Sequence, residues 1–391
     1  MFDIKGKYTS ARIFIDDVEP ELLQQLNRVV NNPAFDKPIF IMPDTHVGKG
    51  CVIGFATLLG SKVVPNVIGV DIGCGVYAVK IQGIEFFSLS EIDTSIRQIV
   101  PFGNKVHNEI LINMKQDFPW EALNHAVEEL SFELNHFRKD IVPFEVIPPN
   151  YDFSYFQDLC KRINIDESYA VKSVGTLGGG NHFIEIGKDS KQNNWLTIHS
   201  GSRNLGLKVC HYWQPKNSEL GYLEGKELIG YFFDMLFAQE YARFNRYKMM
   251  SNIINIMDLY PSQWIESVHN CIDFMDLVIR KGAIRSDLGQ DILIPLNMRD
   301  GTLLCKGKGN LEWLSTAPHG AGRIMSRGQA KKTLTVEEFE KDMNGIYSTS
   351  VGNSTLDESP RVYKDSKMIE ELIKPTVEVI DKIIPILNMK A

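Results

Sequence analysis

Short apolar runs, each closed by glycine or proline, dominate the first eighty residues of the chain. Apolar runs bounded by turn residues are typical of β-strands. We therefore predict strands at residues 38–43, 52–59 and 67–73. Similar segments follow at 181–186, 195–200 and 292–296, where the apolar pattern alone leaves the type of element ambiguous.

Elsewhere the apolar residues recur every three or four positions, which is the period of an amphipathic helix. A first stripe comprises Leu123, Val127, Leu130, Leu134 and Phe137. A second predicts a long helix over about 224–250, with an apolar side formed by Ile229, Phe232, Phe233, Leu236, Phe237 and Phe244. Thr335 and Glu338 have the spacing of a capping box, which predicts a shorter helix through Met343.

Strands and helices are interspersed without a regular strand–helix–strand alternation, a pattern that favours an α+β fold. The chain contains no internal repeat, low-complexity tract or flexible linker. Its polar, glycine-rich stretches extend from residue 43 to residue 328. A site assembled from so many segments implies one domain, residues 1–391.

The composition excludes several classes of protein. With 43% hydrophobic and 23% charged residues, the chain is typical of soluble globular proteins. No apolar run approaches membrane-spanning length, and the first fifteen residues lack the hydrophobic stretch of a secretory signal. Six cysteines spread over 391 residues do not form a disulfide framework. We therefore expect a cytoplasmic protein, a monomer with no membrane partner.

The net charge of −7 argues against general coating of nucleic acid, but it leaves room for a local basic groove. Positive residues gather late in the chain, at 305–310 and 322–332. A solvated loop is the more common explanation of such runs. Charge alone therefore does not identify a nucleic-acid site.

The first candidate for chemistry is Cys74, which lies in the stretch NVIGVDIGCGVYAVK (66–80), three places after Asp71. A disulfide, a packed core thiol and a metal thiolate are the three interpretations, and the composition argues against the first. Four histidines also lie beside small or polar residues: His182, His199, His269 and His319. Carboxylate, thiolate and imidazole together form a transition-metal ligand set, in which a thiolate can bridge two ions. Spacing alone does not show that these side chains meet, and a single histidine is more often structural.

Glycines flank several of these residues. Gly73, Gly75 and the run 178–180 permit positive φ and let the backbone approach an ion or a phosphate closely. The run is not a P-loop, because the lysine and the Ser or Thr that should follow its last glycine are absent.

The motifs themselves resemble one known family. In order, they are MPDTHVGKG, DIGCGV, GTLGGGNHFIEI, HSGSRNLG, the HN of SVHNCIDF, RKGAIR, STAPHGAGRIMSR and a lysine next to the carboxyl terminus. Together they resemble the RtcB family of RNA ligases, from residue 42 to residue 391. The resemblance implies a compact domain with central β-sheets, flanking helices and a metal-lined cleft. It also implies the use of GTP and Mn²⁺ through a covalent histidine–GMP intermediate.

The resemblance assigns roles to individual residues. Asp71, Cys74 and His182 would bind one Mn²⁺, while Cys74, His199 and His269 would bind a second. His319 matches the nucleophile that carries GMP. Ligand chemistry by itself would equally allow Zn²⁺, so the preference for Mn²⁺ comes from the family alone.

The resemblance also implies a guanylate pocket and contacts to RNA. The pocket would be formed by Asn181, His182, Phe183, Ile184, Glu185, His269, Asn270, Pro295, Leu296, Asn297, Met298, Thr302, His319, Gly320, Ala321, Gly322, Tyr363 and Lys390. Glu185 would accept hydrogen bonds from the guanine edge. A role for Lys390 requires a last strand, at about 376–389, that is docked in the core. Arg203, Lys281, Arg323 and Arg327 would bind RNA phosphates.

These assignments predict an RNA ligase that joins a 3′-phosphate or 2′,3′-cyclic-phosphate end to a 5′-hydroxyl end. One rival is a dinuclear metal-dependent phosphodiesterase or cyclic phosphatase that ignores GTP, and another is a non-catalytic RNA-binding protein. The chain departs from the usual family pattern at 294–302, where Asn297 stands in place of serine, and at Pro318, just before the histidine. These departures suggest a divergent branch that repairs damaged RNA rather than splicing tRNA.

Overall fold

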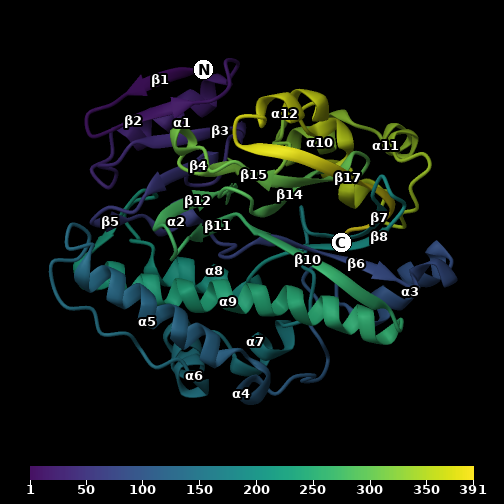
Figure 1. Ribbon diagram of the computed structural model, residues 1–391, viewed down its shortest axis with the longest axis horizontal. Coiled ribbons are helices and arrows are strands. Elements are labelled where there is room, and N and C mark those ends of the chain that lie inside the picture. The colour runs from purple at the N-terminus through teal and green to yellow at the C-terminus, as the bar shows by residue number, and fades with distance from the viewer.

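Two large β-sheets with helices on both sides of them make up the protein, and the computed structural model describes all 391 residues (Figure 1). The α-helices are α1 (Pro20–Val30), α2 (Pro65–Ile68), α3 (Leu89–Ile99), α4 (Met114–Asp117), α5 (Trp120–His136), α6 (Phe153–Arg162), α7 (Glu167–Ser173), α8 (Arg203–Trp213), α9 (Gly225–Ile256), α10 (Arg327–Thr333), α11 (Val336–Asp342) and α12 (Ser366–Leu372). Four short 3₁₀ helices are η1 (Ile84–Phe86), η2 (Leu311–Trp313), η3 (Asn353–Glu358) and η4 (Pro360–Val362). The strands are β1 (Phe2–Lys5), β2 (Ser10–Ile13), β3 (Ile39–His46), β4 (Ile53–Leu58), β5 (Lys62–Val63), β6 (Gly75–Gln82), β7 (Phe183–Lys188), β8 (Asn194–Ser200), β9 (Leu223–Glu224), β10 (Tyr260–Val268), β11 (Asn270–Ile272), β12 (Val278–Lys281), β13 (Ala283–Arg285), β14 (Asp291–Asn297), β15 (Gly301–Gly307), β16 (Thr316–Pro318) and β17 (Val377–Met389). This mixture confirms the predicted α+β class.

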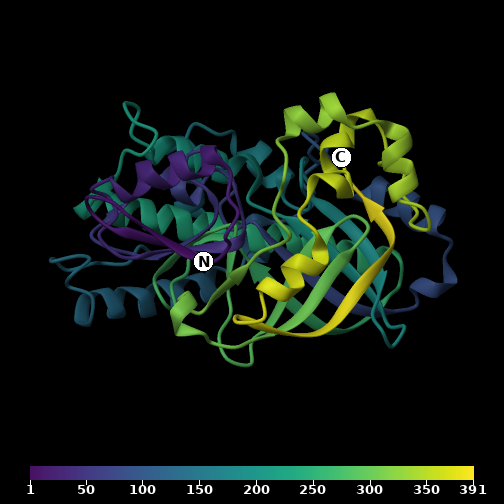
Figure 2. The same ribbon diagram turned by 90° about the horizontal axis from the view of Figure 1, so that it is seen from above.

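Segments that are distant in sequence pair within each large sheet. The six-stranded sheet has the order β1-β2-β3-β4-β12-β11, and the seven-stranded sheet the order β10-β6-β8-β7-β17-β15-β14. The two edges of the second sheet approach each other, since the backbone N–H of Leu293 in β14 donates to Ser267 Oγ in β10 at 2.9 Å. Seen from above, β1 and β2 lie in one half of the molecule and β17 in the other (Figure 2).

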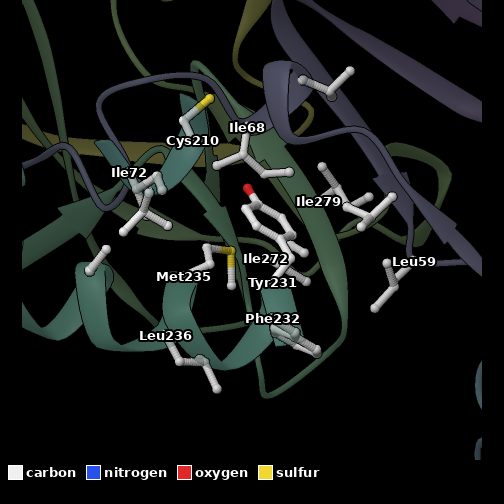
Figure 3. Packing of buried hydrophobic residues seen from close by; sticks show 14 of the residues in the cluster. Leu59, Ile68, Ile72, Cys210, Tyr231, Phe232, Met235, Leu236, Ile272 and Ile279 are labelled. Carbon is white, nitrogen blue, oxygen red and sulfur yellow. The ribbon is translucent and has the colours of Figure 1, made fainter. Parts of the chain in front are cut away.

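The long helix α9 supports both sheets from below, and α5, α6 and α7 cover its other side (Figure 1). Most of its residues are buried, including Tyr231, Phe232 and Met235. Figure 3 shows Tyr231 surrounded by side chains from α2, α8 and β11, such as Ile68 and Cys210. A helix that is apolar on several sides is stable only inside a core. Helix α9 is therefore part of the core, and neighbouring loops pack against it.

Several predictions from the sequence are confirmed. Leu123, Val127, Leu130 and Leu134 of the first stripe are buried on α5, whereas Phe137, placed in the same stripe, follows the helix and is exposed. The predicted long helix is α9, which continues to Ile256. Thr335 and Glu338 form both hydrogen bonds of the capping box at the start of α11. The predicted last strand is β17, docked between β7 and β15. All six cysteines are free and buried, and none of the helices combines the length and apolar content needed to cross a bilayer.

The strand predicted at 67–73 is wrong. Residues 65–68 form the single helical turn α2, because Pro65 occupies the first turn, where its missing N–H costs nothing. Gly69 and Gly73 then adopt positive φ angles of 91° and 69°. The strand begins only at Gly75, so the residues around Cys74 form a loop.

Candidate metal and nucleotide site

The loop that carries Cys74 is pressed against α9, and its glycines make this approach possible. A Cβ on Gly73 would lie 2.8 Å from Gln239 Cα of α9, and one on Gly75 would lie 2.6 Å from Ser267 O of the neighbouring strand β10. Arg246 of α9 fixes the loop, since its Nη1 donates to Gly73 O at 2.7 Å and to Ser200 O at 2.8 Å. The glycines beside Cys74 therefore allow close packing. This packing places the thiol near the start of β6 and the end of β8.

Asn245, the neighbour of Arg246 on α9, holds the segments that precede His182 and follow His199. Its Oδ1 accepts hydrogen bonds from the backbone N–H groups of Gly175 and Thr176, at 2.8 and 3.0 Å. Its Nδ2 donates to Gly201 O at 3.1 Å. One pair of helix residues thus positions three ligand-bearing segments.

Cys74 lies at the centre of five converging side chains, which we call the donor cluster: Asp71, Cys74, His182, His199 and His269. The ligand atoms of Asp71, Cys74 and His182 lie within 4.8 Å of one another, as do those of Cys74, His199 and His269. Cys74 Sγ is 3.5 Å from His182 Nε2 and 3.3 Å from His199 Nε2. The two triads predicted from the resemblance are therefore assembled, with the thiol common to both.

The protonation of His182 fits a metal ligand. Its Nδ1 lies 2.9 Å from Leu177 O, which can only accept, so the proton is on Nδ1 and the Nε2 lone pair is free. That lone pair faces Asp71 Oδ2 at 2.9 Å. Two acceptors at this distance require a cation or an additional proton between them.

The other ligands have the same character. His199 Nε2 and His269 Nε2 are 3.3 Å apart. Burial, followed by the neighbouring histidines, holds the pKa of both imidazoles well below the usual value, so both are neutral. Burial and the charge of Asp71 raise the pKa of the Cys74 thiol, an effect that a bound divalent cation would reverse. Carboxylate, thiol and neutral imidazoles facing one another are a donor set suited to transition metals.

His319 stands next to the donor cluster, with its ring centroid 4.9 Å from that of His269. Its Nδ1 is 2.6 Å from Oδ2 of the fully buried Asp44, and its backbone N–H donates to the same oxygen at 3.2 Å. A carboxylate accepts only, so the Nδ1 proton points to Asp44. The Nε2 lone pair of His319 is therefore free for nucleophilic attack.

A cavity of about 790 Å³ opens beside these residues. Asp71, Cys74, His199 and His269 of the donor cluster line it. So do sixteen of the expected pocket residues: Asn181, Phe183, Glu185, His269, Asn270, Pro295, Leu296, Asn297, Met298, Thr302, His319, Gly320, Ala321, Gly322, Tyr363 and Lys390. The two exceptions are His182, which belongs to the donor cluster, and Ile184.

The expectation that Ile184 lines the pocket is wrong. Side chains alternate across a strand, so Ile184 and Ile186 enter the apolar core together with Leu387 and Met389 of the neighbouring strand. Phe183 and Glu185 of β7 face the cavity instead, as do Asn388 and Lys390 near the end of the chain.

The buried end of the chain is held by an ionic network. Lys390 Nζ donates to Glu358 Oε2 at 2.8 Å and to Asn181 O at 3.1 Å. Tyr363 donates its hydroxyl to the same Glu358 oxygen at 2.8 Å. Burial alone would raise the pKa of Glu358, but Lys390, Arg327 and Arg323 together lower it. The penultimate lysine is thus ordered inside the cavity wall.

The four residues expected to bind RNA separate into two pairs. Arg323 and Arg327 line the cavity and lie 3.4 and 3.6 Å from Glu358 Oε1. Lys281 is buried, and its Nζ donates to the backbone oxygens of Lys49 and Asn66. Arg203 donates to Thr176 Oγ1 and Gly103 O. Neither Lys281 nor Arg203 lines the cavity, so the geometry favours a supporting role for both instead of the phosphate contact expected.

Asn297, the main departure from the usual family pattern, serves the turn between β14 and β15. Its Oδ1 accepts from the backbone N–H groups of Arg299 and Asp300, at 3.0 and 2.9 Å. Its Nδ2 donates to Asp300 Oδ2 at 2.8 Å. Asn297 therefore stabilises this turn at the rim of the cavity.

Among the functional residues that were missed from the sequence are Asp44, Arg246 and Glu358. Asp44 lies in MPDTHVGKG, a segment singled out only for its histidine, and its partner is 275 residues away. Arg246 and Glu358 lie in a helical pattern and a polar loop, where nothing in the spacing distinguishes them. For these two the sequence offers no signal.

Comparisons with known proteins agree over nearly the whole chain. A family model described as tRNA-splicing ligase RtcB matches residues 25–391. The RNA-splicing ligase RtcB of Escherichia coli strain K12 is 29% identical over 402 residues, which cover 93% of this chain and 92% of that protein. The tRNA-splicing ligase RtcB of Nanoarchaeum equitans is 26% identical over 457 residues, with 96% and 92% covered. That of Archaeoglobus fulgidus is 24% identical over 446 residues, with 93% and 89% covered.

Proposed function

The chain belongs to the RtcB family, and from this premise we propose that it is an RNA ligase. It joins an RNA 3′-phosphate, supplied directly or by opening of a 2′,3′-cyclic phosphate with water, to a 5′-hydroxyl end in tRNA splicing or RNA repair. The observation that carries the proposal is the position of His319 beside the donor cluster, with its Nδ1 proton directed at Asp44.

In the first step His319 Nε2 attacks the α-phosphorus of GTP. A P–N bond forms, the bond from that phosphorus to the bridging oxygen breaks, and pyrophosphate leaves. The carboxylate of Asp44 holds the imidazole in one tautomer and stabilises the positive charge that develops on the ring.

In the second step an oxygen of the RNA 3′-phosphate attacks the phosphorus held on His319. The P–N bond breaks, the imidazole regains its lone pair, and the RNA end carries GMP through a diphosphate linkage. The 5′-hydroxyl then attacks the RNA phosphorus, loses its proton, and displaces GMP. Arg323 and Arg327, on the cavity wall, are placed to bind the phosphates of the RNA ends.

Two Mn²⁺ ions are the proposed cofactors, one held by Asp71, Cys74 and His182 and the other by Cys74, His199 and His269. When bound, they supply Lewis-acid stabilisation of the negative charge that develops on the phosphoryl oxygens.

Incubation with GTP labelled in the α-phosphate and Mn²⁺ tests the proposal. We expect a protein-bound GMP adduct that is labile in acid and stable in base, together with joined product from 3′-phosphate and 5′-hydroxyl RNAs. His319→Ala should abolish both, whereas His125→Ala, which changes an exposed histidine on α5, should abolish neither.

Two outcomes would contradict the proposal. Hydrolysis of a cyclic phosphate without any GMP adduct would identify a phosphodiesterase. Binding of cleaved RNA without conversion of its ends would identify a non-catalytic RNA-binding protein.

A further inference from the structure

Two polar side chains face each other in the wall of the cavity, on strands from opposite ends of the sequence. Asn388 of β17 pairs with Glu185 of β7 in the sheet register. Asn388 Nδ2 donates to Glu185 Oε2 at 2.8 Å, and both side chains are 1% exposed. A register shift between Pro385 and Leu387 decides which residues of β17 face the cavity, and it therefore places Asn388 opposite Glu185 there.

Each member of the pair retains one acceptor without a partner. Glu185 Oε1 and Asn388 Oδ1 are buried and form no hydrogen bond within the protein. Because Nδ2 of Asn388 is directed at Glu185 Oε2, the amide oxygen is the atom of Asn388 that remains for a ligand. Buried acceptors without partners are rare in proteins, and here both residues line the cavity that receives the nucleotide.

We propose that Asn388 is a specificity-determining residue that accepts a hydrogen bond from the exocyclic 2-amino group of guanine and positions Glu185 to accept from the ring N1–H. The proposal rests on the proposed function, because it requires a guanine nucleotide in this cavity. It extends base recognition from Glu185 to a residue near the carboxyl terminus.

The chemistry of the bases explains why a pair of acceptors selects guanine. Guanine presents two adjacent donors, N1–H and the 2-amino group. Hypoxanthine keeps N1–H but lacks the amino group, and adenine presents an acceptor at N1 and no 2-amino group. A base that lacks a donor leaves a buried acceptor unpaired, and this penalty, more than the hydrogen bond itself, produces discrimination.

Binding of GMP and of IMP in the presence of Mn²⁺, measured by calorimetry, tests the proposal on the whole protein. IMP differs from GMP only by the absent 2-amino group. We expect the native protein to prefer GMP by about tenfold or more, as for one buried acceptor left unpaired. Asn388→Ala should remove most of this preference, chiefly by weakening GMP binding.

Two further variants separate recognition from folding. Asn388→Ser keeps a hydroxyl that can donate to Glu185 and accept from the amino group, so it should retain part of the preference. Asn194→Ala removes a strand asparagine that does not line the cavity and whose Nδ2 donates to Glu85 Oε2 at 3.3 Å. This change should leave the preference unchanged. If Asn388→Ala does not fold, Asn388→Ser and the comparison of ligands on the native protein still decide.

Equal binding of GMP and IMP by the native protein would overturn the proposal, as would an unchanged preference in Asn388→Ala. Either result would leave the proposed function intact if GTP still labels His319. The proposed function fails separately if GTP neither labels His319 nor binds, and the role of Asn388 then fails with it.

Discussion

Two parts of the cavity wall balance charge in different ways. The donor cluster brings a carboxylate, a thiol and three imidazoles together, with lone pairs of His182 and Asp71 facing each other at 2.9 Å. In the second part, which we call the base pocket, Lys390 and Tyr363 satisfy one oxygen of Glu358, and Asn388 satisfies one oxygen of Glu185. The donor cluster requires a cation or a proton from outside, whereas Lys390 neutralises Glu358 within the base pocket.

This difference indicates which part of the site is formed before ligands arrive. The donor atoms are positioned by Arg246 and Asn245 of α9, but their mutual repulsion is relieved only by a cation or a proton. The base pocket is preorganised, because its ion pair and its cross-strand hydrogen bond exist in the protein alone. Removal of metal should therefore abolish chemistry and leave recognition of the base largely intact.

The largest effect should follow Cys74→Ser, because this thiol belongs to both triads. Loss of an outer partner of a ligand costs about 10–100-fold, so loss of a ligand shared by two triads should lower RNA joining by more than about 1000-fold. Bound Mn²⁺, measured by elemental analysis, should fall with it.

The matched control is Cys160→Ser, which makes the same change at a buried thiol on α6. It should join RNA at the native rate. A Cys74→Ser protein that retains both Mn²⁺ and activity would remove the thiol from the site.

Asp44→Asn should produce the next largest effect. Asparagine keeps the shape but loses the charge, and its amide can donate to His319 Nδ1 and so select the wrong tautomer. General acid–base groups contribute about 100- to 10,000-fold, so we expect guanylylation of His319 to slow by about 100- to 1000-fold. In single-turnover experiments the rate at saturating GTP should fall while the GTP concentration at half-saturation changes little.

Asp189→Asn provides the comparison for Asp44→Asn. Asp189 is also a buried acid, but it accepts from Asn193 and Trp195 in the β7–β8 hairpin. Its variant should guanylylate normally. An undiminished rate in Asp44→Asn would show that the carboxylate does not orient the nucleophile.

The donor cluster and the base pocket also differ in how far the sequence predicts them. Asp71, Cys74 and the histidines lie in glycine-rich motifs whose residue types already indicate metal chemistry, and the resemblance then groups them correctly. Their convergence depends on α9. The apolar pattern predicts this helix, but it does not predict that Asn245 and Arg246 of the helix hold the ligand-bearing segments.

The base pocket depends on register, which no local pattern encodes. Glu185 and Ile184 are neighbours in one apolar run. Glu185 lies on the side of β7 that faces the cavity, and Ile184 lies on the side that faces the core. Asn388 meets Glu185 across 203 positions, in a phase set by a bulge. The prediction at 67–73 failed for a related reason, since two glycines with positive φ turned an apolar run into a loop.

Lys390→Met tests the self-neutralised base pocket through stability. Removing one partner of a buried ion pair usually costs about 3–5 kcal/mol. We expect a loss of about 2 kcal/mol, below that range, because Arg323 and Arg327 remain near Glu358. Denaturant unfolding at neutral pH measures it.

The pH dependence has a definite sign. The folded-state pKa of Glu358 is lowered, so its stabilising contribution is present above its ordinary value of 4.5 and is lost as the pH falls below that value. The difference between native protein and Lys390→Met should therefore shrink in acid. Lys374→Met, which breaks an exposed pair with Glu371, should change stability little at any pH. Equal effects from the two lysines would show that the buried pair contributes no more stability than the exposed pair.

The smallest effect concerns the proton on Glu185. Burial raises the pKa of Glu185 to about 8, although Asn388 and Lys390 act to lower it. The free protein is therefore expected to hold a proton on Glu185 at pH 7. The ordinary value is 4.5, so the protein gains stability from this group below that pH and loses it as the pH rises through about 8. Guanine binds the carboxylate through N1–H and should displace the proton.

Calorimetry of GMP binding at pH 7, in two buffers that differ in ionisation enthalpy, should therefore report release of close to one proton. The affinity for GMP should rise with pH up to about 8, by at most tenfold per pH unit, and level off above it, because the carboxylate is then already ionised. Glu185→Gln has no proton to release at this position and should give the same heat in both buffers. If the native protein also gives equal heats, the carboxylate is already charged before the nucleotide arrives, and the base pocket is balanced by Lys390 rather than by a proton.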